Sequence, residues 1–218
     1  MLGTAVAKAK SKPSSGDETK ARIIDATLST LKEEGIVGTS ARAIARAGDF
    51  NQALIFYHFG SVNDAIVAAV AHMSDRRMEN HRAKLEQASS LPELIRVARE
   101  LHGDDSTHDN MTVLTQALAG GFNDDEMSAK LYSHLEPWPQ MVAETIERVL
   151  GDSPVAETMP SRQIADIISA LFLGIELLDD LNPGHGHADA MFDSLQSLAE
   201  LLDDLLATPL LDFFRPES

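Results

Sequence analysis

The 218-residue sequence contains no cysteine, which excludes disulfide bonds, thiol catalysis and metal sites built on thiolates. It also lacks any apolar run of about eighteen residues or more, the length that a membrane-spanning helix needs. The first residues, Met1–Lys8, carry no apolar core of a secretory signal. We therefore expect a cytoplasmic protein without a membrane partner.

Basic residues are scarce, since 18 Lys and Arg stand against 34 Asp and Glu and the formal net charge is −16. Such a balance argues against nucleic acid until the charges are located along the chain. Residues 1–64 hold eight basic and seven acidic residues, whereas residues 65–218 hold ten basic and 27 acidic residues. The acidic part would be held away from a DNA duplex and so orient the first part on it, or it is simply a solubilising surface.

Signatures of catalysis are also absent. The sequence has no phosphate-binding glycine loop, no nucleophile elbow and no convincing catalytic set. The pair His185 and His187 has no cysteine and no carboxylate fork to complete a metal site, so a plain turn is the simpler interpretation. We expect no enzymatic activity, no metal and no cofactor.

What the sequence does contain is apolar residues spaced three and four apart, which predicts an all-α fold. Pro137 and Pro139 must kink or split one long helix, and residues 103–106 should end another. We expect a loop over 151–160 and a turn over 182–187. The expected helices cover 17–35, two short segments within 40–59, and then 62–87, 90–102, 110–119, 124–150, 161–181 and 191–205.

The two short segments within 40–59 have the pattern of a helix-turn-helix. Ser40 can cap the first helix, Gly48-Asp49 can form the turn, and Asn51 can cap the second helix. Asp tolerates the left-handed conformation that such a turn requires. In a helix-turn-helix the second helix usually enters the major groove of DNA.

The segment 40–59, with Ile23–Leu28 and Gly35 before it and Gly60–Ile66 after it, resembles the amino-terminal DNA-binding domain of the TetR family of bacterial transcriptional regulators. The likeness covers about the first third of the chain. It implies a helix-turn-helix DNA-binding domain over 17–64 and a helical ligand-binding and dimerisation domain over 65–207. A mobile basic arm over 1–16 and an irregular tail over 208–218 complete the expected organisation.

A helical wheel of the second helix places Ile55 and Phe59 inside and leaves Ala53 and Tyr57 outside. An Arg can bind guanine, a Gln can bind adenine, and Tyr can reach the phosphate backbone, whereas His58 is better suited to a hydrogen bond within the domain. The residues expected at the DNA are Ser40, Arg42, Asn51, Gln52, Ala53, Leu54, Phe56, Tyr57 and His58.

Three positions depart from the family pattern. Phe56 stands where Tyr is common, which removes a hydrogen bond to phosphate; Asp49 stands where Gly is usual; and Val62 replaces a common phosphate-binding Lys. We expect modest affinity for nonspecific DNA. These departures also favour an alternative, a helical binding or scaffold protein that no longer reads DNA.

The carboxy-terminal half carries the remaining expectations. The helix 161–181 is apolar nearly all round, and Met191, Leu195, Leu198, Leu202 and Leu205 form a seam on the last helix, so both would be covered by a symmetric partner. The resemblance implies a homodimeric regulator, most often a repressor, that leaves a palindromic operator when a small-molecule effector binds. Residues expected to line the effector site are Met111, Phe122, Trp138, Met141, Phe172 and Glu176.

Overall fold

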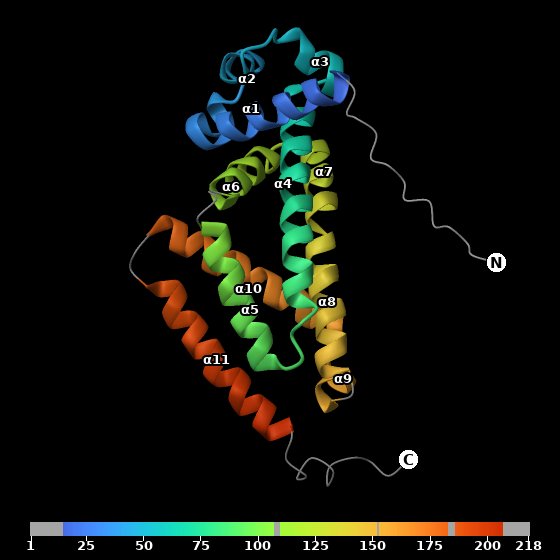
Figure 1. The fold of residues 1–218 in the computed structure, drawn as a ribbon, viewed down its shortest axis with the longest axis vertical. Helices are drawn as coiled ribbons and strands as arrows, with labels where there is room; N and C mark the ends of the chain where they lie inside the picture. Colours follow the sequence, from blue (N-terminus) through green and yellow to red (C-terminus); the bar gives the residue numbers. More distant parts are fainter. Residues whose placement is uncertain (1–14, 107–109, 152, 183–185, 207–218) are drawn as a thin grey trace, which may run out of the picture. The chain divides into compact units, whose positions relative to one another are not determined.

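The computed structural model describes residues 15–106, 110–151, 153–182 and 186–206. In these residues the chain forms α-helices and no strand, as the apolar spacing predicts (Figure 1). The chain divides into two compact units, one up to Ala69 and the other from Val70 onward. Helix α4, Val62–Leu85, contributes residues to both units.

The first unit consists of three helices and the first turns of α4. These are α1 (Ser15–Gly38), α2 (Ala41–Gly48) and α3 (Ala53–Phe59). Its core is small and well enclosed, because Ile23, Ile44 and Ile55 expose none of their surface. Three residues from three different helices thus fix α1, α2 and α3 around one apolar centre.

The second unit contains the rest of α4 and seven further helices. Helix α10 packs mainly against α8, and α11 lies along α5 (Figure 1). The core includes Leu101, Ile146, Ile175 and Phe192, each at most 2% exposed. The helices are α5 (Leu91–Ser106), α6 (Asn110–Gly121), α7 (Asp125–Leu135), α8 (Pro137–Leu150), α9 (Pro154–Thr158), α10 (Ser161–Leu181) and α11 (His187–Leu206).

Prolines divide α7 from α8 as expected, and α10 has the predicted bounds. The predicted break at 103–106 is wrong, because α5 continues to Ser106. A glycine in a helix costs only about 1 kcal/mol relative to alanine. Burial of Leu101 at 1% exposure and an ion pair of 2.5 Å between Lys84 Nζ and Asp104 Oδ2 offset that cost.

The glycine signal at the end of α6 was a good guide, because the helix ends at Gly121, two residues beyond the expected end at 119. Gly121 is buried, and a Cβ atom there would lie 3.2 Å from Leu131 Cδ1. The glycine therefore also permits close packing of α6 on α7.

Two loop expectations also need correction. The expected loop over 151–160 contains the short helix α9. Ser15 and Gly16 belong to α1 and not to the expected arm. The rest of the arm and the tail over 208–218 lie outside the described residues.

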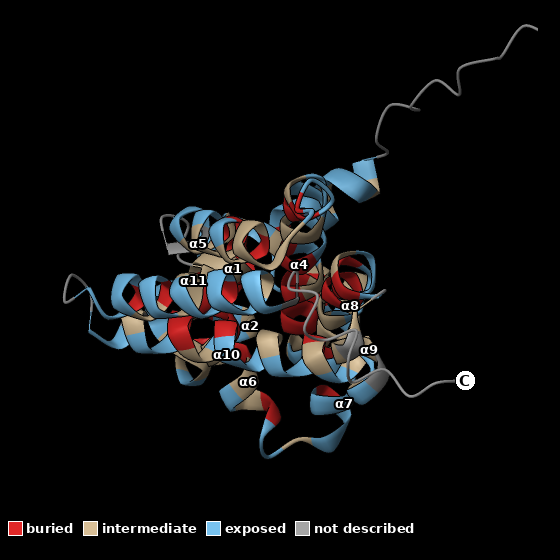
Figure 2. Ribbon diagram, turned by 90° about the horizontal axis from the view of Figure 1, so that it is seen from below, coloured by how far each residue is buried: buried red, intermediate tan, exposed pale blue. Residues whose placement is uncertain are grey.

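Burial separates the helices of the second unit into two kinds. In Figure 2, α8 carries many buried residues, whereas much of α10 and α11 is exposed.

In the described part of the chain no single helix is long and apolar enough to cross a membrane; α3 and α4 meet that criterion only when joined, and a bend of 66° separates them.

Candidate DNA interface and helical cavity

The turn between α2 and α3 has the geometry that its sequence predicts. The Ser40 side chain caps α2 by accepting a hydrogen bond of 3.2 Å from the Ala43 amide. Asp49 ends the helix in the left-handed conformation, with φ 50° and ψ 59°. Arg22 of α1 donates to the carbonyl oxygens of Gly48 and Asp49, at 3.0 and 3.2 Å, and so holds the turn from outside.

The start of α3 is held by Asn51. Gln52, the residue directly before the helix, makes no side-chain cap bond, but the Asn51 side chain accepts a hydrogen bond of 2.9 Å from the Ala53 amide, which satisfies one of the free N–H groups at the start of the helix. Its inner side carries Ile55, fully buried, and Phe59, partly buried against the same core. Packing inside and a cap at the start therefore fix the orientation of the outer side.

The outer side of α3 is strongly exposed. Tyr57 exposes 81% of its surface and Phe56 50%, and Gln52 and Ala53 are also exposed. His58 is half-buried and stacks edge-on against the Tyr57 ring at 4.9 Å between centroids.

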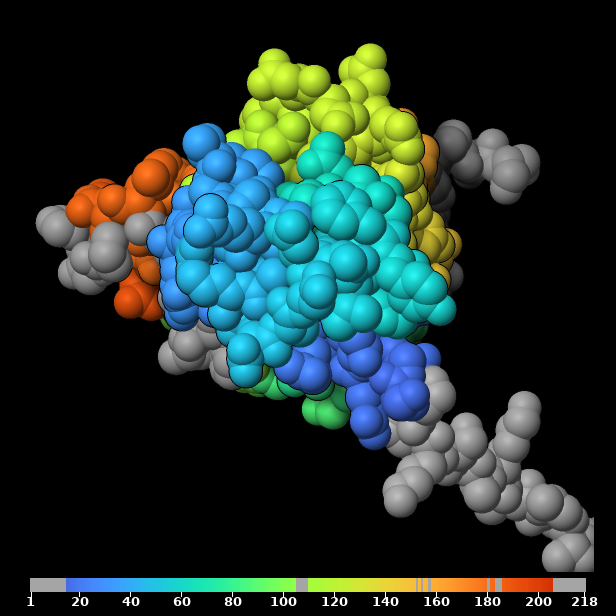
Figure 3. Space-filling view, turned by 90° about the horizontal axis from the view of Figure 1, so that it is seen from above, coloured from blue at the N-terminus to red at the C-terminus, as the bar shows by residue number. Residues whose placement is uncertain are grey.

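The other residues expected at DNA divide into exposed and packed positions. Ser40, Arg42 and Asn51 are exposed, whereas Leu54 is half-buried and packs against the core of the first unit. Helices α2 and α3 lie together on one face of this unit, coloured light blue to cyan in Figure 3. Leu54 is therefore the position in this set that is least available to a ligand.

Lys20 of α1 also lies at this face and was not predicted from the sequence. It lines a shallow hollow with Asp17, Tyr57 and His58, although more than thirty positions of sequence separate it from Tyr57. A lysine near the start of the first helix would have been the only signal. Arg46, by contrast, is engaged by Glu34 at 2.6 Å and offers less charge to an external anion.

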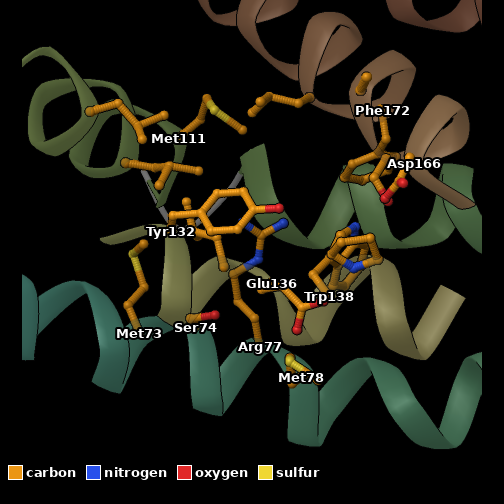
Figure 4. A pocket seen from close by; sticks show the side chains of 17 residues that line it. Met73, Ser74, Arg77, Met78, Met111, Tyr132, Glu136, Trp138, Asp166 and Phe172 are labelled. Atoms are coloured by element: carbon orange, nitrogen blue, oxygen red, sulfur yellow. The ribbon is translucent and has the colours of Figure 1, made fainter. Parts of the chain in front are cut away.

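The second unit encloses a cavity of about 290 Å³ among α4, α6, α7, α8 and α10 (Figure 4). Its volume lies near the lower end of the range for small-molecule sites, roughly 300–1,000 Å³. Most of its wall is aliphatic, aromatic or thioether. The lining residues are Met73, Ser74, Arg77, Met78, Met111, Leu114, Leu118, Tyr132, Leu135, Glu136, Trp138, Pro139, Asp166, Ser169, Ala170, Phe172 and Leu173.

Three of the six residues expected at an effector site, Met111, Trp138 and Phe172, line this cavity. The other three lie elsewhere. Phe122 is 81% exposed at the surface, and Met141 is buried in the core. Glu176 is buried beside α5, where its Oε1 lies 2.5 Å from His102 Nδ1. This hydrogen bond raises the pKa of His102 more than burial lowers it.

Polar groups are few in the cavity wall and concentrated at two places. The Arg77 guanidinium lies over the Trp138 ring at 5.7 Å from its centroid, and Figure 4 shows this arginine pointing from α4 into the cavity. Glu136 and Asp166 each bind Arg162, at 2.7 and 2.9 Å. These two hydrogen bonds raise the pKa of Arg162.

Sequence analysis missed Arg77, Glu136 and Asp166 as cavity residues. Their charges are typical of solvated helix faces, and the side chains of Glu136 and Asp166 do remain 41% and 53% exposed at the edge of the cavity. Near them, the Ser169 hydroxyl is buried and has no hydrogen-bond partner among the described residues. Such a group is normally satisfied, so it marks a place for a polar atom of a bound molecule or a water.

Part of the apolar seam expected on the last helix packs within the chain itself. Met191 and Leu195 pack against the core of the second unit. Leu198, Leu202 and Leu205 remain 51%, 37% and 51% exposed. Helix α10 continues this apolar surface with Ile167, Leu171, Leu173, Leu177, Leu178 and Leu181, which are all at least 37% exposed.

Comparison with known proteins gives a family match for the first unit. Residues 23–70 match the model of bacterial regulatory proteins, tetR family. An HTH-type transcriptional repressor of Mycobacterium tuberculosis is 27% identical over 110 residues, as is an HTH-type transcriptional regulator of Mycobacterium bovis. These residues are 50% of this chain and 52% of each relative, so the chain spans about half the length of the curated relatives it matches.

Solved structures show the same fold over most of the chain. A TetR-family regulator of Cytophaga hutchinsonii superposes with a TM-score of 0.69 at 19% identity, covering 87% of this chain and 96% of that one. The fatty acid degradation regulator FadR of Bacillus halodurans superposes with a TM-score of 0.68 at 14% identity, covering 86% of this chain and 96% of that one. A transcriptional regulator of Saccharomonospora viridis in complex with choline superposes with a TM-score of 0.67 at 19% identity, covering 84% of this chain and 96% of that one.

Proposed function

We propose that the chain is a regulator of the tetR family and not an enzyme, and that it acts as a cytoplasmic repressor. In this proposal a homodimer binds a palindromic operator and leaves it when a small molecule binds the helical cavity. The single observation that carries the DNA-binding part is α3, which is capped, anchored by a fully buried Ile55, and exposes 81% of Tyr57.

The contacts with DNA follow from the chemistry of the exposed side chains. Arg42 and Gln52 can donate to base edges or phosphates, and Tyr57 can donate to a phosphate. Ala53 is small enough to pack on a thymine methyl group. Lys20 adds a positive charge beside Tyr57, where it would neutralise a backbone phosphate.

Dimerisation is proposed through α10 and α11. Many of their leucine and isoleucine side chains are exposed in the single chain, and burying them is a reason for two copies to associate. Packing the two helices against the same two helices of a second copy would give a four-helix interface with twofold symmetry. The dimer would then present two copies of α3 to successive major grooves, about 34–36 Å apart.

Release by a small molecule is proposed from the cavity in the second unit. It has the apolar wall and the few fixed polar groups that small-molecule sites share. The choline named with the regulator of Saccharomonospora viridis supports ligand binding on this fold, without identifying a ligand for this chain. An effector changes DNA binding only if it binds the DNA-competent and released states with different affinities.

Selection of tight-binding duplexes from random DNA tests the proposal. The purified full-length protein, freed of bound ligand, should enrich a palindrome at near-physiological salt. Tyr57→Ala should lose this enrichment while the circular dichroism and the mass in solution stay unchanged. Enrichment of no sequence by a folded dimer would contradict the proposed function.

The alternative is a helical scaffold whose first unit no longer reads DNA. Three observations favour it: the excess of 27 acidic over ten basic residues after position 64, the acidic Asp49 at the turn, and Val62 at the start of α4. Salt dependence separates the two functions. A regulator loses DNA affinity steeply as salt rises, because counterions are released on binding, whereas a scaffold has no affinity to lose.

A further inference from the structure

The charges around the cavity are distributed unequally. Glu136 and Asp166 line the wall, but both are bound by Arg162, which is not part of the wall. One arginine thus faces two carboxylates and offsets much of their negative charge. Arg77 remains as the cation of the wall itself, half-buried among thioether and aromatic groups.

Trp138, the aromatic side chain beside Arg77, already has a cation next to its ring. The Arg77 guanidinium lies over one face of Trp138, 5.7 Å from the ring centroid. The Trp138 ring also lies near Phe172, with 6.0 Å between the centroids and 36° between the planes. A cationic ligand on this surface would have to approach Arg77 against charge repulsion.

A guanidinium has five N–H donors in a planar fork, so it can bind a carboxylate through two parallel hydrogen bonds while keeping another partner. Met73, Met78 and Met111 line the same space with flexible apolar side chains that adapt to a chain or a ring. The wall therefore offers one site for an anion and an apolar surround for the rest of the molecule.

We propose that the effector of this cavity is a small amphipathic monocarboxylate, whose carboxylate binds Arg77 and whose apolar body packs among the methionine side chains and Trp138. This inference rests on the proposed function for the consequence of binding, but not for binding itself. It assigns Arg77 as the specificity-determining residue, and Arg162 as the residue that keeps the two acidic side chains from repelling an anion.

The test uses three probes with the same apolar chain: octanoate, octan-1-ol and octylammonium. Calorimetric titration of the full-length protein should rank octanoate first and octylammonium last. Arg77→Gln should lower the affinity for octanoate by roughly tenfold or more, because it removes a charge-assisted hydrogen bond. The affinity for octan-1-ol should stay within about twofold of its original value. Arg76→Gln is the matched control, since Arg76 is the exposed neighbour outside the wall.

Arg162→Gln gives an independent readout of the same electrostatics. Loss of this arginine leaves Glu136 and Asp166 without the cation that binds them. Octanoate should then bind more weakly and octylammonium more tightly than to the unsubstituted protein. A structural role alone for Arg162 would weaken all three probes together.

Several outcomes would overturn the inference: no octanoate binding at millimolar concentration, octylammonium binding more tightly than octanoate, or octanoate binding unchanged in Arg77→Gln. The proposed function fails separately, in the DNA selection. If octanoate binds through Arg77 without changing the affinity for the selected duplex, the ligand class stands and the release mechanism is wrong. If DNA binds and octanoate does not, the ligand class is wrong and the regulator stands.

Discussion

Phe56 exposes half of its surface on the outer side of α3, at a position where a hydroxyl could meet a phosphate. Phe56→Tyr adds that hydroxyl without changing the packing of the buried side of the helix. We expect operator binding to become roughly tenfold tighter or more, since a hydrogen bond to a charged group contributes about 1.5–3 kcal/mol net and about 1.4 kcal/mol is tenfold in affinity. Fluorescence anisotropy on the selected duplex measures the change; equal or weaker binding would show that Phe56 does not face phosphate.

Asp49 combines two effects at one residue, a left-handed backbone and a negative charge close to the proposed DNA face. Asp49→Asn keeps a residue that tolerates φ 50° and removes the charge, whereas Asp49→Gly removes both the charge and the side chain. Both variants should bind nonspecific DNA more tightly at low salt. If only the glycine variant binds nonspecific DNA more tightly, the backbone at residue 49, and not the charge of Asp49, limits the affinity.

Two histidines of the second unit should give its stability a dependence on pH. Burial, followed by the charges of Arg77 and Lys84, lowers the pKa of His81 to about 4. The unfolded chain takes up a proton at His81 near pH 6.5, but the folded chain does not until about pH 4, so stability falls as pH decreases across that interval.

His102 acts in the opposite direction, because its pKa is raised, chiefly by the hydrogen bond with Glu176. Its stabilisation is complete below the unfolded pKa of 6.5 and is lost as pH rises through the folded value. Urea unfolding across this pH range should show both losses. His81→Gln should reduce the dependence of the unfolding free energy on pH below pH 6.5, and His102→Gln should reduce it above pH 6.5. Unchanged slopes in both variants would assign the pH dependence to other groups.

At the scale of helices, α10 and α11 should hold the dimer together. Leu178 is 53% exposed in the single chain, and Leu178→Glu would bury a charge in the proposed interface. We expect the dissociation constant of the dimer to rise by roughly two orders of magnitude. Sedimentation velocity measures this, and Phe122→Glu is the control, because Phe122 is exposed in the turn between α6 and α7, outside α10 and α11. An intact Leu178→Glu dimer would place the interface elsewhere.

Helices of this fold were predictable where local signals and burial agree. The apolar period gave α10 its bounds, and the caps at Ser40 and Asn51 are local hydrogen bonds that residue type alone indicates. Gly103 misled, because a glycine signal is worth only about 1 kcal/mol and α5 continues through it to Ser106, whereas Gly121 does end α6.

The candidate sites follow the same division. The outer side of α3 is set by the seven-residue helix itself, so its exposed residues could be named from the sequence. The cavity depends on side chains from five helices, and the Arg162 ion pairs join positions 26 and four residues apart. Glu176 was expected at the ligand, but its carboxylate is hydrogen-bonded to His102 in the core. This partner lies 74 residues away in the sequence, so no local pattern indicates the contact.

At the scale of the whole molecule, the proposed function requires that the cavity and the DNA surface affect each other. Helix α4 is continuous from Val62 to Leu85 and supplies Met73 and Arg77 to the cavity wall, so one element belongs to both units. Linkage makes the coupling reciprocal: if an effector weakens operator binding by a factor, the operator weakens effector binding by the same factor. Typical coupling corresponds to roughly 5–150-fold.

We therefore expect octanoate at saturation to raise the operator dissociation constant, and saturating operator to raise the octanoate dissociation constant equally. Both can be measured on one preparation, by anisotropy and by calorimetry. Arg77→Gln should keep the operator affinity of the unsubstituted protein and lose its response to octanoate. An operator dissociation constant that keeps rising with octanoate concentration would mean direct competition at the DNA surface, since a ligand that shifts an equilibrium between two states has a finite maximal effect.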